Sequence, residues 1–142
     1  MSEIAKVIEE AKAAVVYKEG RAYLFEKGTD EFKNIVGSWE VMTEKALPMP
    51  AFGVSIDEHT RAEMKKGVWI EFVFGKEQVI QEMPFEKLLI CCKEDFRGFN
   101  LIRYWDGKYF GRCFYLDLRE KSMQEFCDCL EKVVRNNSKC FS

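Results

Sequence analysis

The most informative stretch of the sequence is Phe99–Leu118, FNLIRYWDGKYFGRCFYLDL, in which an Asp-Gly pair separates two runs of β-forming residues. Two-residue hairpin turns favour Asp-Gly because a type I′ turn requires positive φ at both central positions. The stretch therefore predicts two antiparallel strands, 99–105 and 108–117, joined by a turn at Asp106-Gly107.

The register expected from this turn sorts the side chains onto two faces of the hairpin. Tyr104 faces Tyr109 next to the turn, and Leu101 faces Arg112 further along. Successive residues of a strand point to opposite faces. One face then carries Phe99, Leu101, Arg103, Trp105, Phe110, Arg112, Phe114 and Leu116, and the other carries Asn100, Ile102, Tyr104, Tyr109, Gly111, Cys113, Tyr115 and Asp117.

Length and composition indicate a globular chain. The 142 residues predict a single domain, 1–142, with a short flexible tail at 136–142. Apolar residues make up 47% of the chain, well above the level typical of disordered proteins. The 22 basic and 24 acidic residues are mixed along the sequence, so there is no basic stripe and we expect no nucleic-acid partner.

The N-terminal residues, MSEIAKVIEEAKAAVV, contain an early Glu and no basic segment followed by an apolar one, so they do not resemble a secretory signal. The longest apolar run, Leu88–Cys92, is far shorter than the ~20 residues that a membrane span needs. We therefore expect a cytoplasmic protein with no membrane partner. In that compartment the six cysteines are expected to be reduced.

Helical spacing of apolar residues predicts helices at both ends of the chain. Glu3–Val16 is expected to be the first helix, after a Ser2 cap. The segment 17–26 is then extended; the alternative is a hairpin that turns at Glu19-Gly20. Thr29 is a good N-cap for a second helix, and Ser55 for a short third one over 55–66. The second helix is expected to bury Phe32, Ile35, Val36, Trp39, Met42 and Ala46.

After Gly67 the spacing of apolar residues changes from one typical of helices to one typical of strands. Val68–Phe74 and Phe85–Cys92 are typical of strands, with a shorter strand over 79–83 between them. A last helix is expected from Ser122 onward, where Glu125 completes a capping box. These elements predict an α+β domain with an antiparallel sheet of about four to five strands, residues 68–117, packed by N-terminal and C-terminal helices.

Arg103 and Arg112 are the first candidate binding residues. In the expected register they lie diagonally on one face, within reach of each other. Two adjacent guanidinium groups repel unless an anion lies between them, and each presents a planar fork that fits a carboxylate or phosphate. The structural alternative is that an internal carboxylate such as Glu71 or Asp117 pairs with them.

Tyr104, Tyr109 and Tyr115, with Asn100 and Asp117, give the other face the amphipathic composition that protein interfaces favour. The alternative is a sheet face half covered by a helix. The loop Leu47–Gly53, which is apolar and holds two prolines, either presents Met49 and Phe52 to a partner or folds over the core edge.

His59 is the only histidine, and no matched nucleophile accompanies it in sequence, so we expect it on the surface. The chain contains no glycine-rich phosphate loop, CxxC pair, HExxH or GxSxG motif. The sequence therefore predicts no catalytic residue, metal site or cofactor.

The sequence favours a small protein-binding or regulatory module over an enzyme. Its working surface is expected to be the sheet around 99–118, and its partner another protein or a second copy of the chain. The alternative is a small-anion pocket, or a minor enzyme, organised by Arg103 and Arg112.

Overall fold

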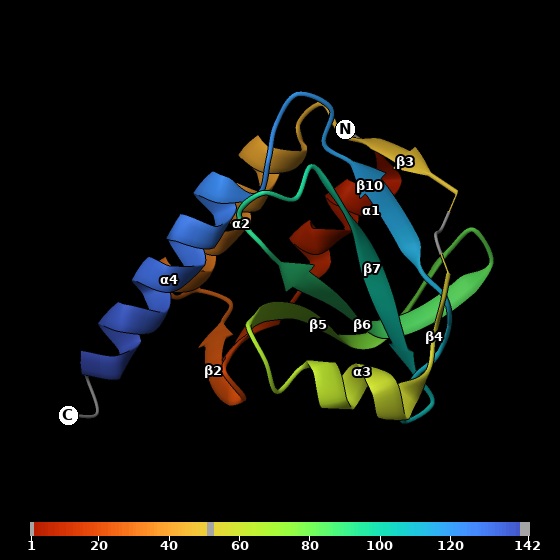
Figure 1. The fold of residues 1–142 in the computed structure, drawn as a ribbon, viewed down its shortest axis with the longest axis horizontal. Helices are drawn as coiled ribbons and strands as arrows, with labels where there is room; N and C mark the ends of the chain where they lie inside the picture. The colour runs from red at the N-terminus through yellow and green to blue at the C-terminus, as the bar shows by residue number, and fades with distance from the viewer. Residues whose placement is uncertain (1, 51–52, 140–142) are drawn as a thin grey trace.

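The computed structural model describes residues 2–50 and 53–139, which form an α+β fold around one large antiparallel sheet (Figure 1). The strand order is β2-β1-β5-β6-β7-β10-β3, with β8 paired to β7. The bounds are β1 Ala13–Lys18, β2 Arg21–Glu26, β3 Leu47–Met49, β5 Val68–Ile80, β6 Met83–Cys92, β7 Gly98–Trp105, β8 Lys108–Tyr109 and β10 Phe114–Asp117. A separate two-stranded sheet joins β4 (Val54–Ser55) to β9 (Gly111–Arg112).

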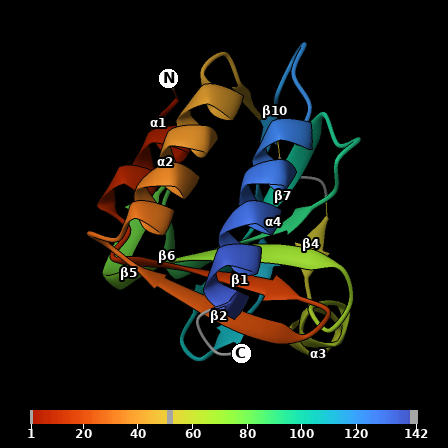
Figure 2. The same ribbon diagram turned by 90° about the vertical axis from the view of Figure 1, so that its left-hand side faces the viewer.

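The helices divide between the two faces of the large sheet. α1 (Glu3–Lys6), a 3₁₀ turn (Val7–Glu10), α2 (Asp30–Thr43) and α4 (Gln124–Lys139) cover one face, where α2 and α4 lie side by side (Figure 2). The short helix α3 (Asp57–Glu63) lies on the other side of the sheet, which we call the open face (Figure 1). None of the helices in the described residues is long and apolar enough to cross a membrane.

The α+β class is confirmed, but the sheet has eight strands rather than four to five. The extra strands come from outside 68–117, because β1, β2 and β3 all join it. The predicted helix over 3–16 is wrong beyond Glu10: residues 13–18 pair with both β2 and β5. The alternative hairpin is the one that forms, with positive φ at Glu19 (49°) and Gly20 (83°).

Two of the predicted helix starts are correct in position. Thr29 Oγ1 accepts a hydrogen bond from the Phe32 N–H at 3.2 Å, so Thr29 caps α2 as expected. Ser122 Oγ accepts one from the Gln124 N–H at 3.3 Å where α4 begins. The N-cap expected at Ser55 does not form, because Ser55 belongs to β4 and α3 starts after Ile56. Residues 136–139, expected in the tail, continue α4, and 140–142 lie outside the described residues.

β5 is longer than predicted. It continues past Gly75 to Ile80, with an irregular register between Val73 and Gln78. The turn into β6 is at Gln81-Glu82, where both residues take positive φ (53° and 64°) without the Asn or Gly that usually marks such a turn. Residues 79–83 are therefore the end of one hairpin rather than a separate strand.

The large core lies between the sheet and the helices on its covered face. Trp39 of α2 is at its centre, fully buried, with its ring 5.4–5.8 Å from those of Phe72, Phe99 and Phe126. Its indole N–H donates to the Ala5 carbonyl at 2.9 Å, which ties α1 to α2. On the open face a smaller buried cluster of Trp69, Leu89 and Tyr109 packs against Met64, which follows α3.

The hairpin at Asp106-Gly107 forms, and its register near the turn is confirmed, with Tyr104 opposite Tyr109 and Trp105 opposite Lys108. Beyond the turn the register moves by two residues, so that Leu101 faces Phe114 and not Arg112. Gly111 takes φ +82°, and residues 111–112 leave the hairpin to pair with β4. A shift of two keeps Phe114 and Leu116 on the same face as Phe99 and Leu101, as predicted, but separates Arg112 from β7.

Candidate functional site

Arg103 is buried, with 6% of its surface exposed, and it binds backbone rather than a carboxylate. Its Nε donates to the Arg112 carbonyl at 2.8 Å and its Nη1 to the Pro84 carbonyl at 2.9 Å. Burial lowers the pKa of this guanidinium from its usual value. The side chain therefore joins three strands, β6, β7 and β9.

Arg112 lies on β9 with its side chain exposed, and its backbone carbonyl, not its guanidinium, is what meets Arg103. The expected pair of guanidinium groups around an anion is not the arrangement found. The alternative that named Glu71 as one possible partner of the arginines is not found either, because Glu71 accepts hydrogen bonds from Tyr17 and Tyr109.

Glu71 of β5 lies on the open face and is the most buried carboxylate in the described residues, with 1% of its surface exposed. The Tyr17 hydroxyl donates to Oε1 at 3.1 Å, and the Tyr109 hydroxyl donates to Oε2. Lys87 Nζ lies 4.0 Å from Oε1. One carboxylate thus links side chains of β1, β5, β6 and β8.

α3 closes over this cluster through Asp57 and Arg61. Asp57 Oδ1 accepts from the Tyr109 N–H at 2.8 Å, and the same carboxylate binds Arg61 Nε at 2.9 Å. These two contacts, the backbone one first, lower the pKa of Asp57. The Arg61 guanidinium lies 5.3 Å from the centre of the Tyr109 ring, within cation–π range.

Burial and the adjacent Glu71 charge raise the pKa values of Tyr17 and Tyr109 above the usual value near 10. Both hydroxyls are therefore held in the protonated, hydrogen-bond-donating form. Both oxygens of the buried Glu71 carboxylate accept a tyrosine hydroxyl, so the cluster ties neighbouring strands of the sheet together.

This arrangement predicts a pH-dependent loss of stability in alkaline solution. The folded-state pKa of Tyr109 is raised, so its stabilising contribution is complete below pH 10 and falls as the unfolded chain loses the proton. Between pH 10 and 11 the free energy of unfolding should drop by about 1 kcal/mol more in the native protein than in Tyr109→Phe. Denaturant titrations at both pH values measure this difference. An equal drop in the free energy of unfolding in the native protein and in Tyr109→Phe would contradict the prediction.

A groove on the open face lies next to the Glu71 cluster. It consists of two hollows, of about 260 Å³ and 320 Å³, that share Trp69, Asn100 and Ile102 as lining residues. The first hollow also touches α3 and β4, and the second extends along Cys91, Phe96 and Tyr115. We call these residues together the open-face groove.

Two features of the open-face groove suit recognition of another molecule. Val54 and Ile56, which border the first hollow, are 65% and 66% exposed, although they are large and apolar. On the groove floor the Asn100 Oδ1 atom is buried and accepts no hydrogen bond from the described residues. The groove thus combines uncovered apolar surface with an unsatisfied acceptor.

Of the three predicted tyrosines, Tyr104 and Tyr109 pack against each other and Tyr115 lines a hollow of the groove. Tyr109 is buried in the Glu71 cluster, Tyr104 is half-buried with its ring 5.0 Å from that of Tyr109, and Tyr115 lines the second hollow. Sequence reasoning missed Trp69 and Tyr17, and it misjudged Glu71. The sequence feature that could have indicated the role of Glu71 is its position as the one acidic residue within the apolar segment VWIEFVF, 68–74.

The remaining candidates are His59, the 47–53 loop and the cysteines. His59 is exposed on α3 at the border of the first hollow. Leu47 and Met49 are exposed on the edge strand β3, and Phe52 lies outside the described residues. The five described cysteines are free, and no cluster of three His, Cys, Asp or Glu side chains suited to a metal occurs in 2–50 and 53–139.

Comparison with known proteins gives no relative. No family model, curated protein or solved structure matches the chain.

Proposed function

We propose that this protein is a small binding module that recognises a protein partner through the open-face groove. The observation that carries the proposal is the groove itself, two hollows joined by Trp69, Asn100 and Ile102 beside the exposed Val54 and Ile56. Apolar anchors around a few polar groups are the usual composition of an interface centre.

The Glu71 cluster supports this role by making the groove rigid. Trp69 and Glu71 are two residues apart on β5, so both point to the open face. The bonds from Glu71 to Tyr17 and Tyr109 hold β1, β5 and β8 in place, and the indole N–H of Trp69 donates to the Lys66 carbonyl at 2.8 Å. A preformed surface loses less conformational entropy on binding.

The anion-pocket alternative is not the function that the geometry favours. The Arg103 guanidinium donates hydrogen bonds to two backbone carbonyl oxygens, while the Arg112 side chain is exposed on a different strand.

Site-specific photo-crosslinking tests the proposal. A benzophenone amino acid at Val54 or Ile56 should capture the same protein from lysate of the source cells. The matched controls are Leu24 and Val79, which are 56% and 57% exposed but lie outside the groove. Capture at the groove positions and not at the controls is the expected result.

The competing outcomes are distinct. Capture of a second copy of the chain would identify the partner as itself. Equal capture at all four positions, or capture at the control positions alone, would contradict an interface at the groove.

A further inference from the structure

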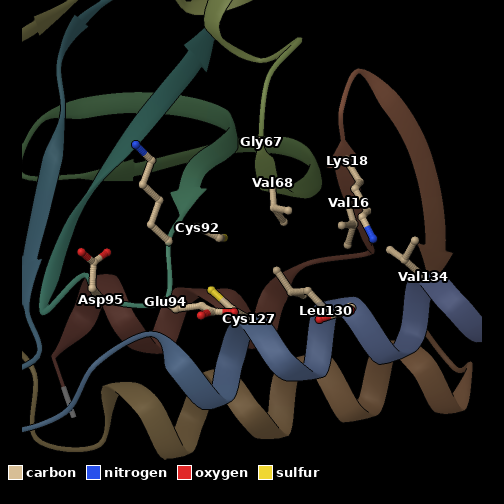
Figure 3. A pocket seen from close by; sticks show the side chains of 12 residues that line it. Val16, Lys18, Gly67, Val68, Cys92, Glu94, Asp95, Cys127, Leu130 and Val134 are labelled. Atoms are coloured by element: carbon tan, nitrogen blue, oxygen red, sulfur yellow. The ribbon is translucent and has the colours of Figure 1, made fainter.

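A separate cavity lies on the covered face of the sheet, next to α4. It lies between α4 and the neighbouring ends of β1, β5 and β6, with a volume of about 570 Å³ (Figure 3). Its apolar lining consists of Val16, Val68, Cys92, Cys127, Leu130 and Val134. We call it the α4 pocket, and it shares no lining residue with the open-face groove.

The size and lining of the α4 pocket suit a small organic molecule. Ligand pockets span about 300–1,000 Å³ and are mostly apolar, with a few polar groups that orient the ligand. Val16, Leu130 and Val134 belong to the buried core, so the pocket reaches the core between α4 and the sheet.

Charged side chains of both signs line the pocket. Three carboxylates, Glu94, Asp95 and Glu131, line it together with two lysines, Lys18 and Lys93. Lys93 Nζ lies 5.7 Å from the centre of the Phe96 ring. Glu131 also carries an exposed ion pair with Arg135, which leaves Glu94 and Asp95 as the carboxylates free of a described ion pair.

The placement of Glu94 brings negative charge to the apolar lining. In Figure 3 its side chain lies beside Cys127, whereas Lys18 is at the other end of the pocket near Val134. Burial first, and then the charges of Glu94 and Asp128, raise the pKa of the Cys127 thiol to about 12. Cys127 therefore stays protonated and serves as apolar lining rather than as a nucleophile.

We propose that the α4 pocket binds an organic ammonium ion with an apolar body. The body packs against Val68, Cys127 and Leu130, and the ammonium group lies at the mouth beside Glu94. An exposed carboxylate contributes up to about 1 kcal/mol to such a pair, which corresponds to about fivefold in affinity. This inference is independent of the proposed protein-binding role of the open face.

Three probes that share a phenethyl group test the charge preference: phenethylammonium, 2-phenylethanol and 3-phenylpropionate. Titration of ¹⁵N-labelled protein, followed by NMR, should move the backbone signals of 92–95 and 127–134. The ammonium probe should bind about threefold to fivefold more tightly than the alcohol, and the carboxylate most weakly. The tightest binding by the carboxylate, or no saturable shift with the ammonium probe at millimolar concentrations, would overturn the proposal.

Two variants and a matched control locate the site. Glu94→Gln should remove the preference for the ammonium over the alcohol while leaving alcohol binding unchanged. Cys127→Met, which fills the pocket, should weaken both probes. Glu58→Gln removes one exposed carboxylate from α3 and should change neither affinity. An equal loss in Glu94→Gln and Glu58→Gln would show that only the net charge matters and would reject the pocket.

Discussion

Glu71→Leu is expected to lower the free energy of unfolding by about 3 to 4 kcal/mol. The substitution leaves the Tyr17 and Tyr109 hydroxyls without their acceptor, and Tyr109 is only 3% exposed. Hydrogen bonds to a charged group contribute about 1.5–3 kcal/mol each, and a buried donor without a partner adds its desolvation penalty. Denaturant unfolding followed by circular dichroism measures the loss.

Two further variants separate this explanation from general damage to the sheet. Glu77→Leu makes the same replacement at an exposed position of β5 and should change stability by no more than about 0.5 kcal/mol. In the triple variant Glu71→Leu/Tyr17→Phe/Tyr109→Phe no tyrosine hydroxyl is left without its acceptor, and the partly exposed Lys87 ammonium can reach water, so most of the stability should return. A triple variant as unstable as Glu71→Leu alone would refute the account of the cluster.

The two arginines are expected to respond very differently to substitution. Arg103→Met should destabilise the protein by about 3 kcal/mol, because two carbonyl oxygens, those of Pro84 and Arg112, lose their donors. Methionine keeps much of the apolar stem, so packing is largely preserved. Arg112→Met removes an exposed side chain and should change stability by less than about 0.5 kcal/mol.

Thermal denaturation of both variants checks this contrast. It should be accompanied by melts of the native protein with phosphate and with dicarboxylates, which we expect to leave the midpoint unchanged. A large loss in Arg112→Met together with an anion-dependent rise in the midpoint would restore the anion-pocket hypothesis.

The hairpin shows how far local sequence reasoning extends. Asp106-Gly107 determines its own turn and the pairs next to it, because a type I′ turn fixes the register of its flanking residues. The two-residue shift beyond Phe110 depends on pairing between β9 and β4, which are more than fifty residues apart. Such long-range pairing leaves no local signal, so the position of Arg112 could not be predicted.

The N-terminal hairpin illustrates a different limit. Residues 3–16 have apolar spacing that fits a helix, yet Ala13–Lys18 forms a strand between β2 and β5. Tertiary pairing on both sides outweighs a helical pattern whose intrinsic preference amounts to tenths of a kcal/mol per residue. The placement of Tyr17 next to Glu71, and so the cluster that holds the open face, follows from that pairing.

The faces of the hairpin were easier to predict than its partners. The alternation of apolar and polar residues places Asn100, Ile102 and Tyr115 on the same side, and all three line the open-face groove. Trp69 could not be assigned to this groove from sequence, because strand order decides which residue of β5 lies near β7.

The most direct test of the binding proposal uses the tryptophan indole N–H signals of ¹⁵N-labelled protein during titration with the partner captured at Val54 or Ile56. Trp69 lines both hollows of the open-face groove, whereas Trp39 is buried in the core on the covered face. The account predicts that the Trp69 signal shifts and saturates, together with the Asn100 side-chain amide, while the Trp39 signal stays in place. A partner that binds without moving the Trp69 and Asn100 signals would contradict the assignment of the open-face groove as the binding surface.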